Sequence, residues 1–537
     1  MSLGTSQAFS VGTEPPLDAL RGSVQPTQGV HSGQGYLGKG NSMGQSAVRR
    51  PGRSLAWIRA EWARQLGLAG LALAVGAGLG VAVVAARNPV YIVAALAGLA
   101  VGVAMLVSTQ VGFLSFVGIA TLLPFGVIPI PLGGFKLTLV DVTLSTLLLV
   151  WLARLLLRRD ERFRASGLEG FVALYAGLAV FSFLMGTGTS AETARLFLKM
   201  INSILLFFTV SNCVVSRRHL EQIIAAVILG GAASSALGIA LYVLPAGTST
   251  RLLTALAPLG YPSGGGVLRY IPSTDVLRAI STSIDPNIFG AMLMLAAVLA
   301  LSQVLAPQPV LDRRLIVVAA GLTLVALLLS YSRSSWMGVL AAGVLMVVLR
   351  YRRVWVLLAL AGAMLTLVVL PTMGDLPVFG GFFAHLQSGF EARDQAAAMR
   401  LGEYKDAFRL IGQYPWFGVG FGVAPDVDLY IGVSSIYLLL AEQMGLIGLS
   451  AYLLTVGILL SRALRVLVTE QPEPAISSLL LGTTAALVGA LTAGIFDHHF
   501  VNLRFPHIVA LFWLMAGLTV VGMRLSRESQ EPSTGPE

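Results

Sequence analysis

The chain alternates long apolar stretches with short polar connections. A helix that crosses a bilayer needs about 20 mostly apolar residues, and by this rule the sequence predicts about fourteen spans. They lie near residues 66–86, 89–109, 112–129, 137–157, 168–186, 196–215, 220–243, 287–306, 314–331, 335–350, 354–371, 434–461, 475–495 and 505–524. The stretch 434–461 is long for one span and carries Gly445 and Gly448, which predicts a break or a strong tilt there. The pattern therefore predicts an all-α polytopic bundle of about 12 to 14 spans.

The two ends of the chain lack this pattern. Residues 1–55 are rich in Gly, Ser, Gln and Pro and have no apolar core of a signal peptide, so we expect a disordered cytoplasmic tail. Residues 527–537 form a second, shorter predicted tail. Between them, residues 56–526 form one predicted transmembrane domain.

Composition supports a membrane protein and excludes other classes. Only 12% of the 537 residues are charged and the mean hydropathy is +0.80, whereas soluble domains have roughly 25% charged residues. The net charge of +10 does not indicate nucleic-acid binding, because the basic residues form short clusters between apolar runs. The single cysteine, Cys213, excludes an internal disulfide, and no Cys/His cluster has metal-ligand spacing. We therefore predict no metal and no cofactor.

The basic clusters predict the orientation of the spans. They occur before the first predicted span and in every second connection after it, at Arg49, Arg50, Arg53, Arg59, Arg64, Arg158, Arg159, Arg162, Arg164, Arg217, Arg218, Arg313, Arg314, Arg350, Arg352, Arg353, Arg462, Arg465, Arg524 and Arg527. Because Lys and Arg accumulate in cytoplasmic loops, this pattern predicts that both termini are cytoplasmic. Two long segments, 245–285 and 373–432, then lie outside. The second contains a predicted amphipathic helix near 398–413, with an apolar face of Leu401, Tyr404, Phe408 and Ile411.

A few basic residues lie on the outer side, where this rule disfavours them. They are Lys136 (beside Asp141), Arg195, Lys199, Arg278, Arg333, Arg393, Arg400, Lys405 and Arg409. Arg333 and Lys199 are the most informative, since charges at membrane depth usually face a bundle interior or a water-filled cavity. The alternatives are side chains that reach to the lipid headgroups, or solvated loop residues. Several arginines converging on one outer cavity would suit a lipid-linked diphosphate, because the guanidinium fork donates two hydrogen bonds to phosphate oxygens.

Three segments of the chain resemble the O-antigen ligase and O-antigen polymerase family of bacterial membrane glycosyltransferases. The first is Arg278 followed by Ser283-Ile284-Asp285-Pro286-Asn287, and the second is the span end that runs from Leu328 to Ser332-Arg333-Ser334-Ser335-Trp336. The third runs from Arg400 through Pro415 and Gly418-Val419-Gly420-Phe421-Gly422 to Glu442, Gly445 and Gly448. The resemblance covers roughly residues 280–460.

The resemblance implies a fold related to the C-type glycosyltransferases and an active site outside the bacterial cytoplasmic membrane. Family members transfer a glycan from undecaprenyl diphosphate to an acceptor, either lipid A-core (ligases) or another lipid-linked repeat (polymerases). The resemblance implies that Arg333, Arg278 and Arg400 hold the diphosphate. We expect Lys199, Arg195, Ser434 and Glu442 in supporting roles. The expected reaction inverts the anomeric centre and needs no metal. Expected partners are the lipid-linked donor, a glycan or lipid-linked acceptor, and membrane lipid.

The sequence departs from the family at one position. Ligases carry a His-Asn pair where this chain has Ser434-Ser435, which favours a polymerase over a ligase. A serine hydroxyl is no general base near neutral pH without activation. Replacement bases are available at His385, Asp426, Asp428, Asp497, His498 and His499, with His498, His499 and Asp428 the preferred candidates. The alternatives are that these residues cap helices or lie among headgroups, or that a diphosphate leaving group needs no base.

Two other classes of function also fit a chain with about fourteen spans. A transporter or flippase would show repeated halves and binding groups near the membrane midplane, whereas here the unusual charges lie at one face and no internal repeat is visible. A non-catalytic assembly partner would fit the missing histidine.

Overall fold

The computed structural model describes residues 101–128, 137–157, 163–186, 188–264, 266–271, 275–350, 395–422, 433–470 and 472–530. The chain divides into two units, Met1–Leu68 and Ala69–Glu537, and all described residues belong to the second. Several predicted features lie outside the described residues. They are both predicted tails apart from 527–530, the spans 66–86 and 354–371, and most of the span 89–109.

The described part of the chain is built almost entirely of helices, which confirms the predicted fold class. Each predicted span within it coincides with a helix: α3 (Thr109–Leu122), α4 (Leu139–Leu157), α5 (Glu169–Met185), α6 (Ala191–Cys213), α7 (Arg217–Val243), α9 (Pro286–Val304), α10 (Arg313–Leu329), α11 (Arg333–Leu349), α16 (Ile436–Arg465), α17 (Pro474–Ala493) and α18 (Pro506–Glu528). Among the described residues, seven helices are long and apolar enough to cross a membrane. The protein is therefore a multi-pass membrane protein.

Three helices form the centre of the bundle. In the most apolar 18 residues of α9, α17 and α18, 83%, 83% and 94% of the residues are buried, whereas in α4 only 39% are buried. α18 packs on α6 and α17, and α17 packs on α9 and α11. Outer helices instead expose large apolar side chains such as Leu156 and Val318, as expected for surfaces that face lipid.

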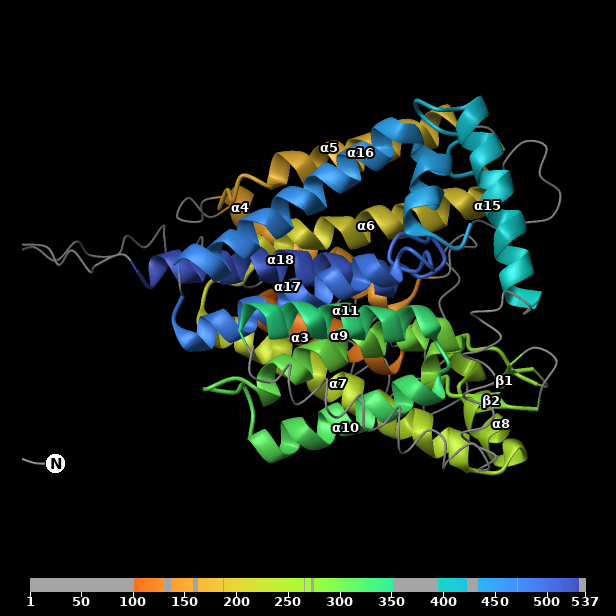
Figure 1. Cartoon of the computed structure of the whole chain (residues 1–537), viewed down its shortest axis with the longest axis horizontal. Coiled ribbons are helices and arrows are strands. Elements are labelled where there is room, and N and C mark those ends of the chain that lie inside the picture. The colour runs from red at the N-terminus through yellow and green to blue at the C-terminus, as the bar shows by residue number, and fades with distance from the viewer. Residues whose placement is uncertain are drawn as a thin grey trace, which may run out of the picture. The chain divides into compact units, whose positions relative to one another are not determined.

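Four elements of the two long connecting segments lie at one end of the bundle. α8 (Ala246–Thr254), the antiparallel pair β1 (Arg269–Tyr270) and β2 (Leu277–Arg278), and α15 (Gln395–Gln413) lie at this end (Figure 1). They belong to the two long segments predicted to face outward, and α15 confirms the helix expected near 398–413. Within this helix Tyr404, Ala407 and Leu410 pack inward, whereas Phe408 is 63% exposed.

The predicted break in the long helix α16 is confirmed at Gly445. This residue has φ 67° and ψ −175°, inside what is otherwise helix. The break frees backbone groups that pair with the segment after α15. Leu446 N–H donates to the Pro415 carbonyl (2.7 Å), and Val419 N–H donates to the Glu442 carbonyl (2.8 Å). The glycine-rich segment 415–420 is therefore seated on the broken helix by main-chain hydrogen bonds.

Candidate functional site

Arg278 anchors the candidate site by tying two turns together. Its Nε donates to the Ser330 carbonyl (2.8 Å), and its Nη2 donates to the Asn287 side-chain oxygen (2.6 Å) and the Tyr331 carbonyl (3.3 Å). Asn287 stands at the start of α9, where Asp285 caps the helix. Within the described part of the chain, Nη1 makes no hydrogen bond, so its N–H groups remain available as donors.

Both turns held by Arg278 carry backbone strain. Ser281 (φ 50°), Ile284 (φ 64°) and Tyr331 (φ 53°) have positive φ without being glycine. Such conformations persist only where the surroundings enforce them, and they cluster at functional sites. The turn with Tyr331 leads into α11, whose first residue is the half-buried Arg333. The positive end of the α11 dipole therefore adds to the charge of this arginine.

Of the three arginines predicted to hold the diphosphate, Arg333 and Arg400 both lie close enough to Arg278 to affect its pKa. The pKa of Arg278 is lowered to about 10, mainly by burial and also by the charges of Arg333 and Arg400, while Asp285 and Asp497 act to raise it. Arg400 is half-buried on α15 and makes no ion pair within the described residues. Arg278, Arg333 and Arg400, here called the outer arginine cluster after their predicted orientation, come from three elements far apart in the sequence. A group of like charges held together in this way suits a ligand with more than one negative charge.

α15 also holds the backbone at Ser434, where the resemblance implies a histidine in ligases. Glu403 accepts a hydrogen bond from Ser434 N–H (2.9 Å), and the Tyr404 hydroxyl donates to the Ser434 carbonyl (3.3 Å). Both residues lie within one turn of Arg400, and Arg400 acts on the pKa of Tyr404, which burial raises. Sequence reasoning missed Glu403 as a site residue, although its place on the predicted helix beside Arg400 was visible.

The turn between α17 and α18 brings Asp497, His498 and His499 against the same backbone. Nδ1 of His498 lies 2.9 Å from the Val433 carbonyl, one residue before Ser434. Asp497 accepts a hydrogen bond from His498 N–H (2.8 Å), and its other oxygen lies 2.8 Å from Nε2 of His499. This last contact is an ion-pair contact and not a well-aligned hydrogen bond. Although burial opposes it, the two histidines hold the pKa of Asp497 below its usual range.

The same three residues offer ligand atoms within 4.8 Å of one another, which is a geometry that can hold a metal ion. However, Nδ1 of His498 already faces a carbonyl and Nε2 of His499 faces Asp497. A metal would have to displace these contacts, so the donors fit a hydrogen-bonded turn better than a ligand set. Of the other predicted bases, His385, Asp426 and Asp428 lie outside the described residues, as do Lys136 and Arg393.

Lys199 forms a buried ion pair and does not reach toward the headgroups. Its Nζ lies 2.6 Å from Asp141, and the two side chains are only 11% and 6% exposed. Asp141 also accepts a hydrogen bond from Thr138 N–H (2.9 Å). The pair joins α4 to α6, with Arg195 one turn away on α6 and half-buried. Glu442, another predicted supporting residue, contributes its carbonyl to the seat of segment 415–420.

We expect Lys199→Met to destabilise the protein. The substitution leaves the Asp141 carboxylate buried without this counter-charge, which typically lowers the free energy of unfolding by about 3–5 kcal/mol. Thermal unfolding in detergent measures the effect. The double variant Asp141→Asn with Lys199→Met removes both charges and should recover most of the loss. An unchanged melting temperature for the single variant would contradict a stabilising role of the pair.

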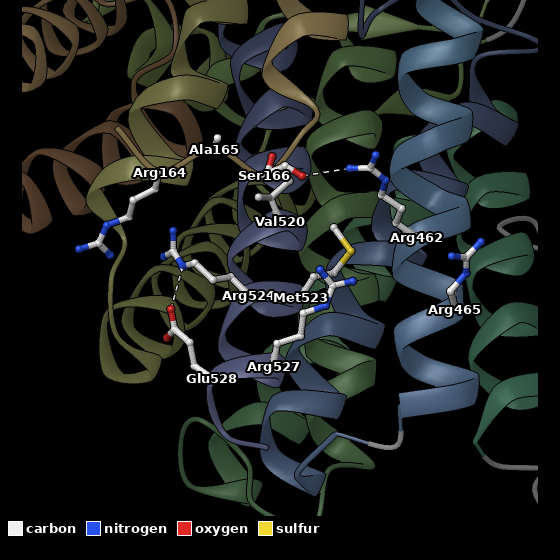
Figure 2. Close-up of a pocket in the computed structure, with 10 residues that line it drawn as sticks. All are labelled: Arg164, Ala165, Ser166, Arg462, Arg465, Val520, Met523, Arg524, Arg527 and Glu528. Carbon is white, nitrogen blue, oxygen red and sulfur yellow. Dashed lines mark hydrogen bonds and ion pairs between the residues drawn. The ribbon is translucent and has the colours of Figure 1, made fainter. Parts of the chain in front are cut away.

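A cavity at the far end of α16 gathers arginines of a different kind. It has a volume of about 460 Å³ and is lined by Arg164, Ala165, Ser166, Arg462, Arg465, Val520, Met523, Arg524, Arg527 and Glu528 (Figure 2). Arg462 donates to the Ser166 carbonyl (3.0 Å), and Arg524 donates to the Ser211 carbonyl (2.7 Å). α16 starts beside Ser434 and ends at this cavity, so the cavity lies at the opposite end from α15. The charge pattern predicts that these arginines are cytoplasmic. In the structure they lie together at one end of the bundle.

Comparison with known proteins bears on the segment that carries the site. A comparison with curated proteins finds no match. The sequence model of the O-antigen ligase family matches residues 318–453, which include Arg333, Arg400, Ser434 and the break at Gly445. The match supports the predicted resemblance to this family, and residues 318–453 are similar to an O-antigen ligase domain.

Proposed function

We propose that the protein is a glycosyltransferase that moves a glycan from undecaprenyl diphosphate to an acceptor hydroxyl, on the outer side of the bacterial cytoplasmic membrane. The observation that carries the proposal is the outer arginine cluster, in which Arg333 and Arg400 belong to the matched domain and Arg278 lies beside them. Arginine pairs with phosphate oxygens through its fork and remains charged at any working pH. The lipid tail would stay in the bilayer while the diphosphate meets the cluster.

In the proposed reaction, the acceptor hydroxyl attacks the anomeric carbon and the diphosphate leaves with the bonding electron pair. Negative charge grows on the leaving oxygen, where fixed guanidinium groups stabilise it most. Three N–H groups of Arg278 are hydrogen-bonded to the two turns, and the N–H groups of Nη1 remain to bind the diphosphate. The same bonds fix the turn that leads into Arg333. A single displacement inverts the anomeric centre, and the arginines supply the charge that a metal ion supplies in other transferases.

The proposed orientation follows from the two ends of α16. The arginine-lined cavity at its far end fits the cytoplasmic side by the charge rule. The outer arginine cluster then faces outward, and both termini are cytoplasmic. The central helices α9 and α17 carry no charged side chain. A transporter for a charged lipid-linked glycan would need binding groups near the midplane, so the lack of charged side chains in these two helices favours the enzyme.

Reconstitution tests the proposal. Purified protein in vesicles with a polyprenyl-diphosphate-linked repeat should form new glycosidic bonds and release polyprenyl diphosphate. A ladder of chain lengths would identify a polymerase, as Ser434 favours, and a single transfer to a distinct acceptor would identify a ligase. Movement of the lipid-linked glycan across the bilayer without bond formation would instead identify a transporter. Neither transfer nor movement would leave a non-catalytic assembly partner.

A further inference from the structure

The structure offers a replacement for the histidine that this chain lacks at Ser434. The ring of His498 lies against the carbonyl of Val433, the residue before Ser434. The two residues are 65 positions apart in the sequence, and only the fold brings them together. The His498 side chain, from the turn between α17 and α18, therefore lies next to the position at which the resemblance implies a histidine.

The contact with Val433 fixes which nitrogen of His498 carries the proton. A carbonyl oxygen only accepts hydrogen bonds, so Nδ1 must be the donor over the 2.9 Å distance. In a neutral imidazole the other nitrogen, Nε2, then holds the free electron pair. Asp497 fixes the main chain of the same residue by accepting its N–H. The ring thus has a set tautomer and position, as a general base requires.

Exposure separates His498 from its neighbours. Asp497 is 6% exposed and His499 is 7% exposed, whereas His498 is only half-buried. Nε2 of His499 also faces the Asp497 carboxylate. Of the described candidates, His498 alone combines partial exposure with a free acceptor nitrogen.

The charges around His498 keep it neutral and connect it to the outer arginine cluster. Burial lowers the pKa of His498 below 6.5 and His499 lowers it further, whereas Asp497 and Glu403 raise it. Glu403 holds Ser434 N–H on α15, one turn from Arg400. Asp497 in turn acts on Arg278. An acceptor near His498 is therefore also near the groups proposed to hold the diphosphate.

We propose that Nε2 of His498 is the general base of the transfer, and that Asp497 is its positioning residue. The inference rests on the proposed function. Nε2 takes the hydroxyl proton as the acceptor oxygen bonds to the anomeric carbon. The bond from that carbon to the diphosphate oxygen breaks, and its electron pair leaves with the diphosphate. The imidazolium then returns its proton to water, which restores the neutral ring.

The test compares His498→Asn with the wild-type protein in the vesicle assay. Asparagine can keep the hydrogen bond to Val433, since its side-chain nitrogen lies where Nδ1 does, but it provides no base. Loss of a general base typically costs about 10²–10⁴-fold in rate, and we expect kcat to fall within this range with little change in KM. His219→Gln, at the start of α7 on the opposite end, is the matched control and should leave transfer unchanged.

The pH profile distinguishes a base from a structural histidine. In the wild-type protein, kcat/KM should fall on acidification with a midpoint below 6.5, because protonation of Nε2 removes the base. This acidic limb should disappear in His498→Asn. In Asp497→Asn it should move to lower pH, because Asp497 raises the pKa of His498. A second substitution, Ser434→His in the His498→Asn background, should recover part of the rate.

The outcomes separate the two proposals. If the wild-type protein forms no glycosidic bond, the proposed function fails. If the wild-type protein transfers glycan and His498→Asn does so at the same rate, the function stands and the base assignment is wrong. A slow His498→Asn variant that keeps the acidic limb would also overturn the assignment, since a different group would then titrate.

Discussion

Replacing Arg333 by Ala is expected to reduce glycan transfer by about 10²–10³-fold, the usual cost of removing one preorganised donor to a developing negative charge. Arg333 opens α11 directly after the strained turn at Tyr331, so its guanidinium starts from a fixed point. Arg278 holds that turn in place. The loss should appear mainly in kcat, because the charge on the leaving diphosphate is largest in the transition state.

A series at this position separates charge from geometry. Arg333→Lys keeps the charge and loses the planar fork, so its rate should lie between those of the wild-type protein and Arg333→Ala. Arg350→Ala, at the other end of the same helix, is the matched control and should transfer normally. Expression level and elution volume in detergent check that each variant is folded. A fully active Arg333→Ala variant would contradict the proposed role of the arginine cluster.

Local sequence patterns predicted the helices well because membrane helices depend on them. An apolar stretch of sufficient length must be helical in lipid, since its backbone groups have no other partners. The helix α15 and the break at Gly445 were predicted on equally local grounds. The exposed Phe408 shows what helical spacing cannot predict. Helical spacing identifies a face, but the packing of α15 on α16 decides which neighbouring residues turn inward.

The candidate site was predicted in its residue types and only partly in its arrangement. The outer arginines stood out because the charge rule disfavours them on that side. Arg278 donates hydrogen bonds to Ser330, Tyr331 and Asn287, and the spacing of residues along the sequence does not predict these contacts. The approach of His498 to Val433 is of the same kind. Lys199 was predicted as a supporting site residue, and its ion pair with Asp141 shows how a charge at membrane depth can also join two helices.

Replacing Gly445 by Ala is expected to destabilise the protein and to abolish transfer. The φ of 67° and ψ of −175° lie in a region that is essentially restricted to glycine, and holding another residue there costs about 1–3 kcal/mol. An added Cβ would also collide with the Trp416 carbonyl oxygen. Either α16 straightens or segment 415–420 moves. Both changes remove the main-chain hydrogen bonds that seat this segment beside α15 and hence disturb Arg400 and Ser434.

Gly457 in the same helix is the matched control for this substitution. A Cβ added there meets nothing within 4 Å. Gly457→Ala should therefore be neutral or stabilise the helix by about 0.5–1 kcal/mol, because alanine loses less backbone entropy. Melting temperatures in detergent and transfer rates in vesicles compare the two variants. Equal behaviour would mean that the break is not needed to seat the outer segment. A loss confined to Gly445→Ala would show that the site depends on this one backbone conformation in α16.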